Sequence, residues 1–479
     1  MADFEVTRVS TPSSQQGPKL VGQGAVGAAF QGCSVALSGE GNTALVGGYG
    51  DAGRLGAVWV FTRNGKTWTQ QGGKLVPNGL NDAAQCGTAV AISADGNTAI
   101  VTGPNNDGDK GGAWVFSRTG SSWTQQGDNL RPASVTNSAF FGASVSISAD
   151  GNTVIVGANN YAQQGAQLAT GAAWIFVRVG SRWNQQGDAL IGTGALGNSM
   201  NQGVGVALSA DGNTAAIGAT LDGANVGAVW VFTRQNGEWT QQGAKIVGSG
   251  AIGASGQGQR VSLSADGNTL AIGATNDDPS TAPAKPFAVG AVWVFSRSGA
   301  VWSQQSKLVA SDAVGNALQG SSVSLSADGD TLLVGGMRDD QLIGATWVWR
   351  RNSGRWTPFG KLVGSLVVGI AGQGASAALS ADGSMALVGG PRADNDEGGA
   401  WFFIAASAPT ITGFTPVSGP VGTLVTITGT GFLGLVRVEI GGVAALAISN
   451  DGTTLVAMVM LGAATGVIKV TTAAGSVSS

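Results

Sequence analysis

Histidine is absent from this chain of 479 residues, and only two cysteines and two tyrosines occur. Without histidine there is no Ser-His-Asp triad, no Cys-His dyad and no HExxH zinc site. Two cysteines are too few for a four-cysteine zinc or iron–sulfur site. These absences remove most enzyme chemistry, and we expect a protein with no catalytic residues, no enzymatic activity and no cofactor.

Charge is also scarce, since charged residues make up 11% of the chain and the formal net charge is −3. The scattered Lys and Arg residues form no basic footprint for nucleic acid. No apolar run approaches the ~20 residues that span a bilayer. The polar start, MADFEVTRVS, does not resemble a secretory signal. We therefore expect neither a nucleic-acid partner nor membrane insertion.

Glycine, by contrast, is abundant, with 80 residues in a chain that is 43% hydrophobic. Collagen would need a strict Gly-X-Y period, and disorder would need low hydrophobicity. Neither condition is met. The composition favours many tight turns between short strands.

A segment of alternating apolar residues around a turn recurs seven times, as in SVSISADGNTVIVGA from Ser144. A GAVWVF-like segment and, in six copies, a WTQQG-like segment follow it. Period-2 alternation and Asp-Gly turns predict four short strands for each unit of ~55 residues, and no helix. We expect the repeated tryptophans to pack between units. The turn glycines are Gly41, Gly96, Gly151, Gly212, Gly267, Gly329 and Gly383.

Seven four-stranded units predict an all-β, seven-bladed β-propeller over residues 1–405. Residues 13–21 match the WTQQGGKLV segment that begins at Trp68, one period earlier, and the seventh unit lacks that segment. We expect this N-terminal strand to complete blade seven and close the ring. An open solenoid is the alternative, but a solenoid needs caps rather than a complementary strand.

The repeated pattern G-x-S-V-A-L-S-x-D-G-N-T…G-A-V-W-V-F resembles the FG-GAP repeat, the unit of the integrin α-subunit head, from about Ser13 to Phe403. The Phe of the family survives only at Phe141-Gly142, and five copies have Gln instead. The family's D-x-D-x-D-G calcium loop is also missing from the S-A-D-G-N-T hairpin. One carboxylate cannot supply the 6–8 oxygens that calcium prefers, so no calcium is expected in the hairpins.

Residues 406–479 differ from the repeats. The segment APTITGFTPVSGPVGTLVTITGTGF resembles the IPT/TIG domain, which implies an immunoglobulin-like β-sandwich. Such modules usually have one more strand after the equivalent of residues 466–470, and only TTAAGSVSS follows here. We expect either an incomplete sandwich or a final strand supplied from elsewhere.

The loops between strands 2 and 3 of each blade, and those between blades, vary in length and share one rim. Function concentrates in variable loops on a rigid scaffold. Their acids and amides have three interpretations: turn chemistry, a face for a glycan or protein partner, and a calcium site near Asp107 and Asp109 or Asp394 and Asp396. The candidates for the binding face are Asn105, Asp107, Asn160, Tyr161, Asp277, Asp278, Asp339, Asp340, Asp394 and Asp396.

Other side chains recur at fixed places in the repeat. We expect the Gln-Gly glutamines to bond loop backbone of a neighbouring blade, with a ligand-reading ring as the alternative. We expect the paired glutamines of the outer strands to be solvated, with a lateral contact between molecules as the alternative. We expect the arginines four residues after the first tryptophans to decorate the short-turn rim, with binding of an acidic polymer as the alternative. Cys33 and Cys86 are expected to be free and buried, with a disulfide as the alternative.

These features predict a non-catalytic binding or adhesion module, extracellular or on the cell surface, that recognises a glycan or protein. The alternative is a structural subunit of a self-assembling fibre, coat or phage tail, with strand addition at the C-terminal sandwich. Release with a virion would fit the lack of a signal. Enzymatic glycoside cleavage by carboxylates such as Asp278 or Asp396 is the third, least favoured class.

Overall fold

The structure is a computed structural model that describes residues 11–81, 83–163, 168–197, 200–278, 288–405, 408–432, 435–450, 452–472 and 475–479. Contacts divide the chain into two compact units, with boundaries between Ser14 and Gln15 and between Phe402 and Phe403. We call Gln15–Phe402 the ring unit and the other unit, to which the residues before Gln15 and Phe403–Ser479 are assigned, the sandwich unit, and each is described by itself. Both consist of four-stranded antiparallel sheets, which confirms the all-β prediction.

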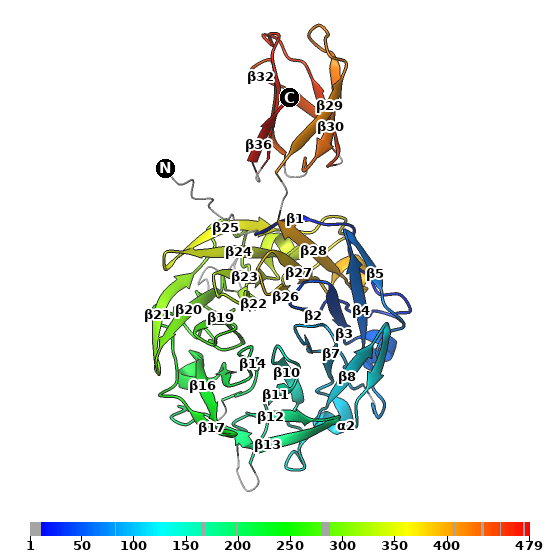
Figure 1. Cartoon of the computed structure of the whole chain (residues 1–479). Coiled ribbons are helices and arrows are strands. Elements are labelled where there is room, and N and C mark those ends of the chain that lie inside the picture. The colour runs from blue at the N-terminus through cyan, green and yellow to red at the C-terminus, as the bar shows by residue number, and fades with distance from the viewer. Residues whose placement is uncertain are drawn as a thin grey trace. The chain divides into compact units, whose positions relative to one another are not determined.

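The ring unit contains a series of four-stranded sheets arranged around a centre (Figure 1). We call each sheet a blade and number the blades in the chain order of their inner strands. The inner strands are β2 (Ser34–Leu37), β6 (Val90–Ile92), β10 (Phe141–Ile147), β14 (Gly205–Leu208), β18 (Arg260–Leu263), β22 (Gln319–Leu325) and β26 (Ser376–Leu379). The second strands are β3 (Thr43–Gly48), β7 (Thr98–Thr102), β11 (Thr153–Ala158), β15 (Thr214–Ala219), β19 (Thr269–Ala274), β23 (Thr331–Gly336) and β27 (Met385–Gly389).

The outer half of each blade holds the tryptophan-containing segments. The third strands are β4 (Ala57–Asn64), β8 (Ala113–Thr119), β12 (Ala172–Val179), β16 (Ala228–Gln235), β20 (Ala291–Ser298), β24 (Ala345–Asn352) and β28 (Ala400–Ala405). The outer strands are β5 (Thr67–Gln70), β9 (Ser122–Gln125), β13 (Arg182–Leu190), β17 (Glu238–Gln241), β21 (Val301–Leu308), β25 (Arg355–Leu362) and β1 (Pro12–Gln15). β1 comes from the start of the chain and lies beside β28.

Five of the loops between second and third strands contain a helical turn of four residues. Each turn has two residues in the left-handed region, so none is a regular helix, in keeping with the sequence pattern. The turns are α1 (Asp51–Arg54), α2 (Asn106–Asp109), α3 (Asp222–Asn225), α4 (Asp339–Leu342) and α5 (Ala393–Asp396).

Backbone hydrogen bonds link the blades in a closed circle. At each turn between the first and second strands, one amide donates to a carbonyl of the next blade's turn, beginning with Gly39 to Ala94 and ending with Ala381 back to Gly39. The bonds measure 2.8–3.0 Å. They satisfy donors that the sheet ladders leave unpaired, and they hold the inner ends of the blades together. The remaining members of the circle are Ala149, Ala210, Ala265 and Ala327.

Glycine is required where neighbouring blades approach most closely. Gly227, just before β16, forms a parallel bridge to Gln257 of the next blade and has a φ of +84°. A Cβ atom at Gly227 would lie 2.1 Å from the Gln257 carbonyl oxygen. A side chain is excluded both by the left-handed backbone and by the contact. The same bridge recurs with Gly56, Gly111, Gly171, Gly290, Gly344 and Gly398.

The core lies between blades, as the repetition of the tryptophans predicts. Trp174 in β12 is 1% exposed and packs with Ile100 and Val115 of the preceding blade. Trp230 packs in the same way with Ile155 and Ile175. These buried aromatic rings explain the abundance of tryptophan through packing.

The sandwich unit has two sheets, in the orders β29-β30-β34-β33 and β32-β31-β35-β36. Val425, Ile427, Phe432, Leu455 and Val470 are among its buried core residues. The short tail that suggested a missing strand forms β36, which pairs with β35 through Val470 and Val477. The strands are β29 (Thr410–Thr415), β30 (Leu424–Thr430), β31 (Leu435–Ile440), β32 (Val443–Ala444), β33 (Leu446–Asn450), β34 (Thr454–Met458), β35 (Ile468–Thr472) and β36 (Gly475–Ser478).

Candidate binding site

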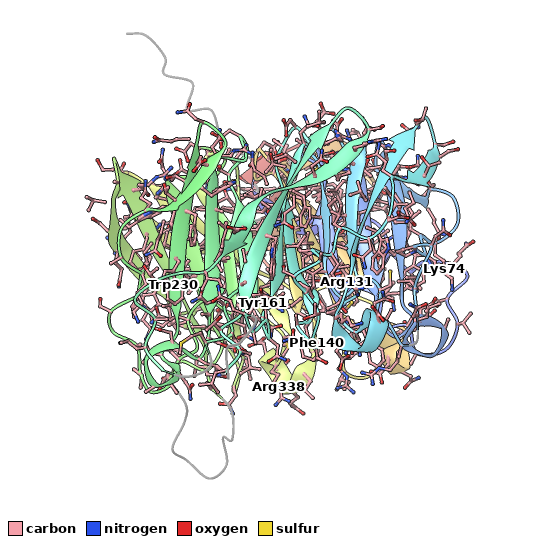
Figure 2. All side chains as sticks on the ribbon, turned by 90° about the horizontal axis from the view of Figure 1, so that it is seen from below. Lys74, Arg131, Phe140, Tyr161, Trp230 and Arg338 are labelled. Atoms are coloured by element: carbon pink, nitrogen blue, oxygen red, sulfur yellow. The ribbon has the colours of Figure 1, made fainter. Side chains whose placement is uncertain are left out.

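The predicted binding residues lie in the loops between second and third strands, at the end of the ring unit that also holds the loops between blades. We call this end the loop rim and the opposite end the turn rim. In Figure 2 the labelled Phe140 and Arg338 lie toward the loop rim. The geometry there is built around one buried side chain in each loop.

In blade four this side chain is Asp222, which is 1% exposed. One carboxylate oxygen accepts a hydrogen bond of 2.6 Å from the Leu196 amide in the loop that precedes the blade. The other lies 2.5 Å from the ammonium of Lys245, in the segment that follows the outer strand β17. A buried carboxylate is costly unless it is both paired and hydrogen-bonded, and Asp222 is both. It therefore ties its own loop to the segments on both sides of the blade.

The same arrangement recurs in three other blades. Each acid is 1% exposed, accepts the amide of a loop residue at 2.7–2.8 Å and pairs with a lysine at 2.5–2.6 Å. The three sets of acid, loop residue and lysine are Asp51 with Val26 and Lys74, Asp277 with Ile252 and Lys307, and Asp339 with Val314 and Lys361.

Blade seven shifts the acid by one residue. Ala393 occupies the equivalent buried position, and the next residue, Asp394, pairs with Lys19. The Val368 amide donates to the other Asp394 oxygen at 3.2 Å. The hydrogen bond from Lys19 is the main cause that lowers the pKa of Asp394. The loop is tied down as in the other blades, although its carboxylate is only partly buried.

The residue that each acid holds is aliphatic, and its side chain points into solvent. The exposed fractions range from 52% to 67%. A buried ion pair thus fixes the backbone while the apolar side chain stays exposed, and the arrangement is repeated around one rim. Such a set of exposed apolar groups on a rigid frame is typical of an interaction surface. The residues are Val26, Leu196, Ile252, Val314 and Val368, and we call them the aliphatic rim.

The predicted binding residues divide into buried and accessible groups. Asp277 and Asp339 belong to the buried ion pairs, and Tyr161 is 6% exposed and stacks edge-on against Trp174. These three hold the loops from within. The residues with intermediate or full exposure are Asn105, Asp107, Asn160, Asp278, Asp340, Asp394 and Asp396.

The carboxylates considered for calcium each face a cation or an amide. Asp107 accepts from Arg131 at 2.7 Å and Lys110 at 3.3 Å, which lower its pKa. Asp109 accepts from Asn105 at 2.8 Å. Asp394 pairs with Lys19, and Asp396 with Arg392 at 3.2 Å. Within the described ranges no three acidic or thiol side chains are grouped as a metal site would require.

The Gln-Gly glutamines are almost fully buried, and their amides bond loop backbone. Gln257 accepts from the Gly248 amide at 2.6 Å and donates to the Gly248 carbonyl at 3.0 Å. The partner is loop backbone, as expected, but it lies in the connection that leads into the same blade, and burial turns the amide away from a ligand. The same pair of bonds is formed by Gln31, Gln202, Gln319 and Gln373.

The paired glutamines of the outer strands form the expected solvated edge only in part: Gln185, Gln304 and Gln305 are exposed, whereas others are half-buried and bonded. In blade one, Gln70 accepts the amide of Gln23 at 2.7 Å, and Gln71 accepts the indole N–H of Trp123 in blade two at 2.9 Å. Both side chains are half-buried. The prediction was wrong for these two glutamines because the groups that donate to them lie in other segments of the chain. The repeat pattern does not show which segments are adjacent in space.

The repeated arginines also connect blades. The Arg118 guanidinium lies over Trp123, 5.5 Å from the ring centroid, and donates to the Thr43 hydroxyl of the preceding blade at 3.1 Å. Burial lowers the pKa of Arg118. A cation stacked on an aromatic face and hydrogen-bonded across an interface serves packing rather than the capture of an acidic polymer.

Cys33 and Cys86 are free thiols in the structure. Burial raises the pKa of Cys33 to about 11 and raises the pKa of Cys86 further. Both are therefore protonated thiols at neutral pH and poor nucleophiles.

The aliphatic rim was missed at the level of sequence, although a signal was there. In each of the five loops the aliphatic residue precedes a glycine, as in Val26-Gly27 and Ile252-Gly253. The two remaining loops have Asn81-Asp82 and Thr136-Asn137 at the equivalent positions. Single exposed aliphatic residues are common on protein surfaces, so the dipeptide acquires meaning only once the loops are seen on one rim.

Comparison with known proteins identifies two families. Residues 302–349 match the FG-GAP repeat, and residues 409–479 match the IPT/TIG domain. Comparison with curated proteins gave no match. Both families are commonly adhesion or binding modules and are typical of extracellular or surface proteins. Among the described residues, no helix has the length and apolar character needed to cross a membrane.

Several solved structures share a distant likeness. Hydrazine synthase of Kuenenia stuttgartiensis is 13% identical, with a TM-score of 0.47 and coverage of 81% of this chain and 96% of that one. The β-propeller domain of Myceliophteria thermophila Cps50 (Swd1) is 10% identical, with a TM-score of 0.48 and coverage of 78% and 96%. A fungal alcohol oxidase of the AA5 family, in complex with copper, is 13% identical, with a TM-score of 0.46 and coverage of 97% and 98%.

Likeness at this level carries no functional information, and the neighbours include enzymes. The family matches are more specific, because they agree with the repeated strand pattern and with the separate sandwich. The chain is therefore similar to the FG-GAP repeat over residues 302–349 and to the IPT/TIG domain over residues 409–479.

Proposed function

We propose that this protein is a non-catalytic binding or adhesion module that acts outside the cell or at its surface and recognises a protein partner through the loop rim. The observation that carries the proposal is the aliphatic rim, whose members are exposed by 52–67% while their backbone amides are held by acids of the loops. Protein interfaces bury apolar anchors of this kind within a polar surround.

A rigid scaffold supports this role. We propose that the ring unit is a seven-bladed propeller closed by the N-terminal strand. The circle of turn hydrogen bonds supports this, as do the bonds from the Gln16 amide to the Phe402 carbonyl at 2.8 Å and from the Leu20 amide to the Ala400 carbonyl at 2.7 Å. A closed ring presents loops with fixed spacing, which reduces the conformational entropy lost on binding.

A protein partner is favoured over a glycan because the fixed, exposed groups at the loop rim are aliphatic. Sugar sites commonly need an accessible aromatic face, and the first tryptophan of every blade is at most 2% exposed. The accessible polar residues Asp278, Asp340 and Asp396 lie in loops of the same rim and would form the polar surround. No catalytic role is proposed for the loop carboxylates. Asp107, Asp394 and Asp396 each form an ion pair with a lysine or an arginine.

The test begins with a screen of the purified full chain against panels of extracellular proteins and glycans, with and without calcium. For each binder, affinity is then measured for a double variant, Ile252→Asp with Val314→Asp. We expect the affinity for a protein partner to fall at least 100-fold, because two charges would be placed at the centre of the interface.

The matched control places the same charges on the turn rim. Val179 and Val301 are 68% and 67% exposed and lie at hairpins between third and outer strands. The variant Val179→Asp with Val301→Asp should bind as the unchanged chain does. Loss of binding in this control, with retention in the loop-rim variant, would refute the proposed face. A glycan binder unaffected by either variant would refute the protein partner.

A further inference from the structure

The inner strands of the blades enclose a cavity of about 210 Å³ on the axis of the ring unit. Its wall consists of residues at the start of each inner strand, including Val35, Val90, Val206 and Val323. Apart from one residue, the side chains that line it are uncharged at neutral pH and are small aliphatic, hydroxyl or thiol groups. The exception is Arg260 at the start of β18.

Arg260 breaks a repeated pattern. At the equivalent position the other blades have serine, alanine or glycine, so no side chain larger than serine occurs there. A residue that departs from the local rule on a repetitive scaffold is a candidate for function. The equivalent residues are Ser34, Ala89, Ser144, Gly205, Ser322 and Ser376.

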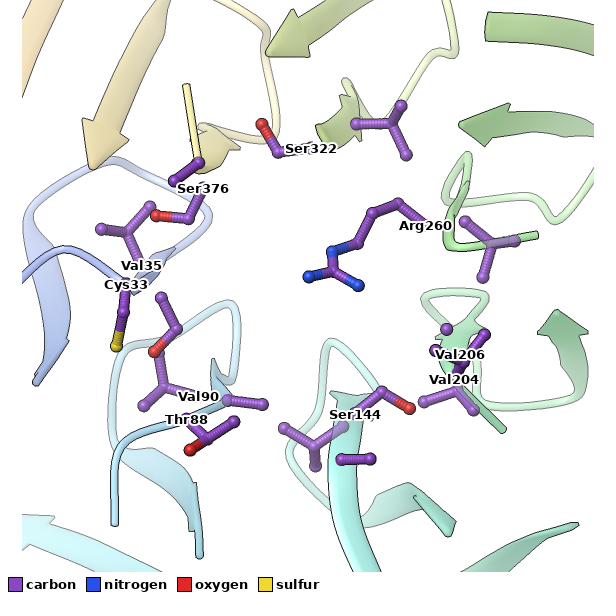
Figure 3. A pocket seen from close by; sticks show the side chains of 18 of the residues that line it. Cys33, Val35, Thr88, Val90, Ser144, Val204, Val206, Arg260, Ser322 and Ser376 are labelled. Atoms are coloured by element: carbon purple, nitrogen blue, oxygen red, sulfur yellow. The ribbon is translucent and has the colours of Figure 1, made fainter. Parts of the chain in front are cut away.

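The Arg260 side chain extends from the wall toward the middle of the cavity (Figure 3). Its Nη1 donates one hydrogen bond, to the Gln259 carbonyl at 2.9 Å. No carboxylate of the described chain lies within ion-pair distance of it. The side chain is accessible to solvent within the cavity, while the surrounding wall desolvates it and lowers its pKa.

The hydroxyl groups around Arg260 do not neutralise it and do not compete with it as donors. Ser144 donates to the Gly203 carbonyl, Ser322 to the Gly374 carbonyl and Ser376 to the Gly32 carbonyl, at 2.7–2.9 Å. Their protons are thus used between blades. The guanidinium, with five N–H groups in a planar fork, remains the strong donor that faces the open volume.

We propose that the axial cavity is a binding site for a small oxyanion, a carboxylate or phosphate group held by Arg260. A guanidinium binds such groups through two parallel hydrogen bonds, and the attraction is strengthened where water is partly excluded. The cavity is smaller than the ~300–1,000 Å³ of drug-sized ligand sites, so the ligand has few heavy atoms. The site is separate from the aliphatic rim and is independent of the partner proposed there.

The experiment measures binding of succinate and of inorganic phosphate to the full chain by calorimetry at constant ionic strength, with succinamide as the neutral counterpart of succinate. We expect saturable binding of at least one anion and none of succinamide. The variant Arg260→Met, which keeps an unbranched stem but removes the guanidinium and its charge, should bind at least tenfold more weakly. Arg182→Met, at an exposed arginine that begins an outer strand, should leave the affinity unchanged.

Folding of Arg260→Met is checked by its melting temperature without ligand. If it does not fold, Arg260→Lys serves instead, since it keeps the charge and loses the fork, and its affinity should still fall severalfold. Binding of succinate alone identifies a carboxylate ligand, and binding of phosphate alone a phosphate-bearing one. The proposal is overturned if neither anion binds the unchanged chain, or if removal of the Arg260 charge or fork leaves the affinity unchanged.

Discussion

Blade four and blade three have different residues at the buried position of the loop between their second and third strands. The difference shows what the loop acids do. In blade four, Asp222 pairs with Lys245 and holds the Leu196 amide. In blade three the equivalent residues are Tyr161 and Ala189, so acid and lysine are lost together. The Tyr161 ring lies edge-on to Trp174, with centroids 4.8 Å apart.

The Tyr161 ring lies against the blade's first tryptophan, where other blades have a lysine ammonium group. In blades five and six, the ammonium groups of Lys307 and Lys361 lie 5.0 and 5.2 Å from the ring centroids of Trp293 and Trp347. An aromatic edge and an ammonium group are alike in presenting positive charge to a π face. Blade three therefore covers its tryptophan with an aromatic ring where blades five and six use an ammonium group.

The exchange also changes the surface. Thr136, the residue of blade three that corresponds to Leu196, is exposed but polar. Blade two has Asn106, which accepts the amide of the exposed Asn81 at 2.7 Å, and Asn129 in place of the lysine. The ion pair accompanies an exposed aliphatic residue, and its absence accompanies an exposed polar one. This correspondence links the buried chemistry to the proposed interface.

The largest effect is expected from breaking one ion pair. Asp339→Ala leaves the Lys361 ammonium and the Val314 amide without their acceptor, and we expect the free energy of unfolding to fall by about 3 kcal/mol. Urea unfolding measures the change. The neighbouring variant Asp340→Asn should cost less than about 0.5 kcal/mol. Equal stability of the two variants would contradict a structural role for the buried acid.

A smaller effect is expected when blade four is converted to the pair of blade three. Asp222→Tyr together with Lys245→Ala should recover about 1–2 kcal/mol of the stability that Asp222→Ala loses, because the tyrosine ring would pack against Trp230 as Tyr161 packs against Trp174. Urea unfolding of both variants gives the difference. If the conversion is as destabilising as Asp222→Ala, the two pairs are not interchangeable.

The Gln-Gly residue provides a second exchange between blades. Gln319→Leu removes the acceptor of the Ala310 amide at 2.7 Å, and we expect a loss of about 2 kcal/mol. Blades two and three have Pro77 and Pro132 at the position of Ala310, with Cys86 and Phe141 at the position of the glutamine. Proline has no N–H group, so the glutamine is not needed there.

A double-mutant cycle tests this correspondence. Ala310→Pro alone leaves the Gln319 carbonyl oxygen unpaired, whereas in the Gln319→Leu background it removes the orphaned amide. We expect it to be less destabilising in that background by about 1 kcal/mol. Urea unfolding measures the loss of stability caused by Ala310→Pro in each background. Equal losses would show that the hydrogen bond from the Ala310 amide does not account for the stabilising effect of Gln319.

The smallest effect for a single residue concerns the turns that the blades share. Burial alone would raise the pKa of Asp211, but hydrogen bonds from Ser209 and Asn213 lower it below 3.8. A lowered folded pKa stabilises the protein above about pH 4, and this contribution is lost as the pH falls through the folded value. The same balance lowers the pKa of Asp95, Asp150, Asp266 and Asp382.

We expect the melting temperature to fall by about 5 °C or more between pH 5 and pH 2.5. Asp211→Asn should flatten this dependence slightly, and Asp128→Asn, at an exposed aspartate of an outer loop, should not. A pH profile that is identical for all three chains would show that the Asp211 turn does not contribute.

The paired glutamines, the arginines and the aliphatic rim mark what the repeat could not reveal. Gln71 was expected to be solvated, yet it accepts the Trp123 indole N–H across a blade boundary. The sequence gives the spacing within a blade but not which neighbour a half-buried side chain reaches. Asp277 and Asp278 illustrate the same limit. They are adjacent acids in one loop, yet Asp277 is buried and Asp278 is exposed.

The sequence by itself determined the all-β class, the strand repeat, the separate sandwich and the poverty of catalytic groups, because period-2 alternation, turn glycines and residue counts are local properties. The tertiary structure decided which acids are buried, which aliphatic residues are exposed and where Arg260 points. Those outcomes depend on contacts between segments far apart in the chain, where burial makes each unpaired polar group costly and so selects its partner.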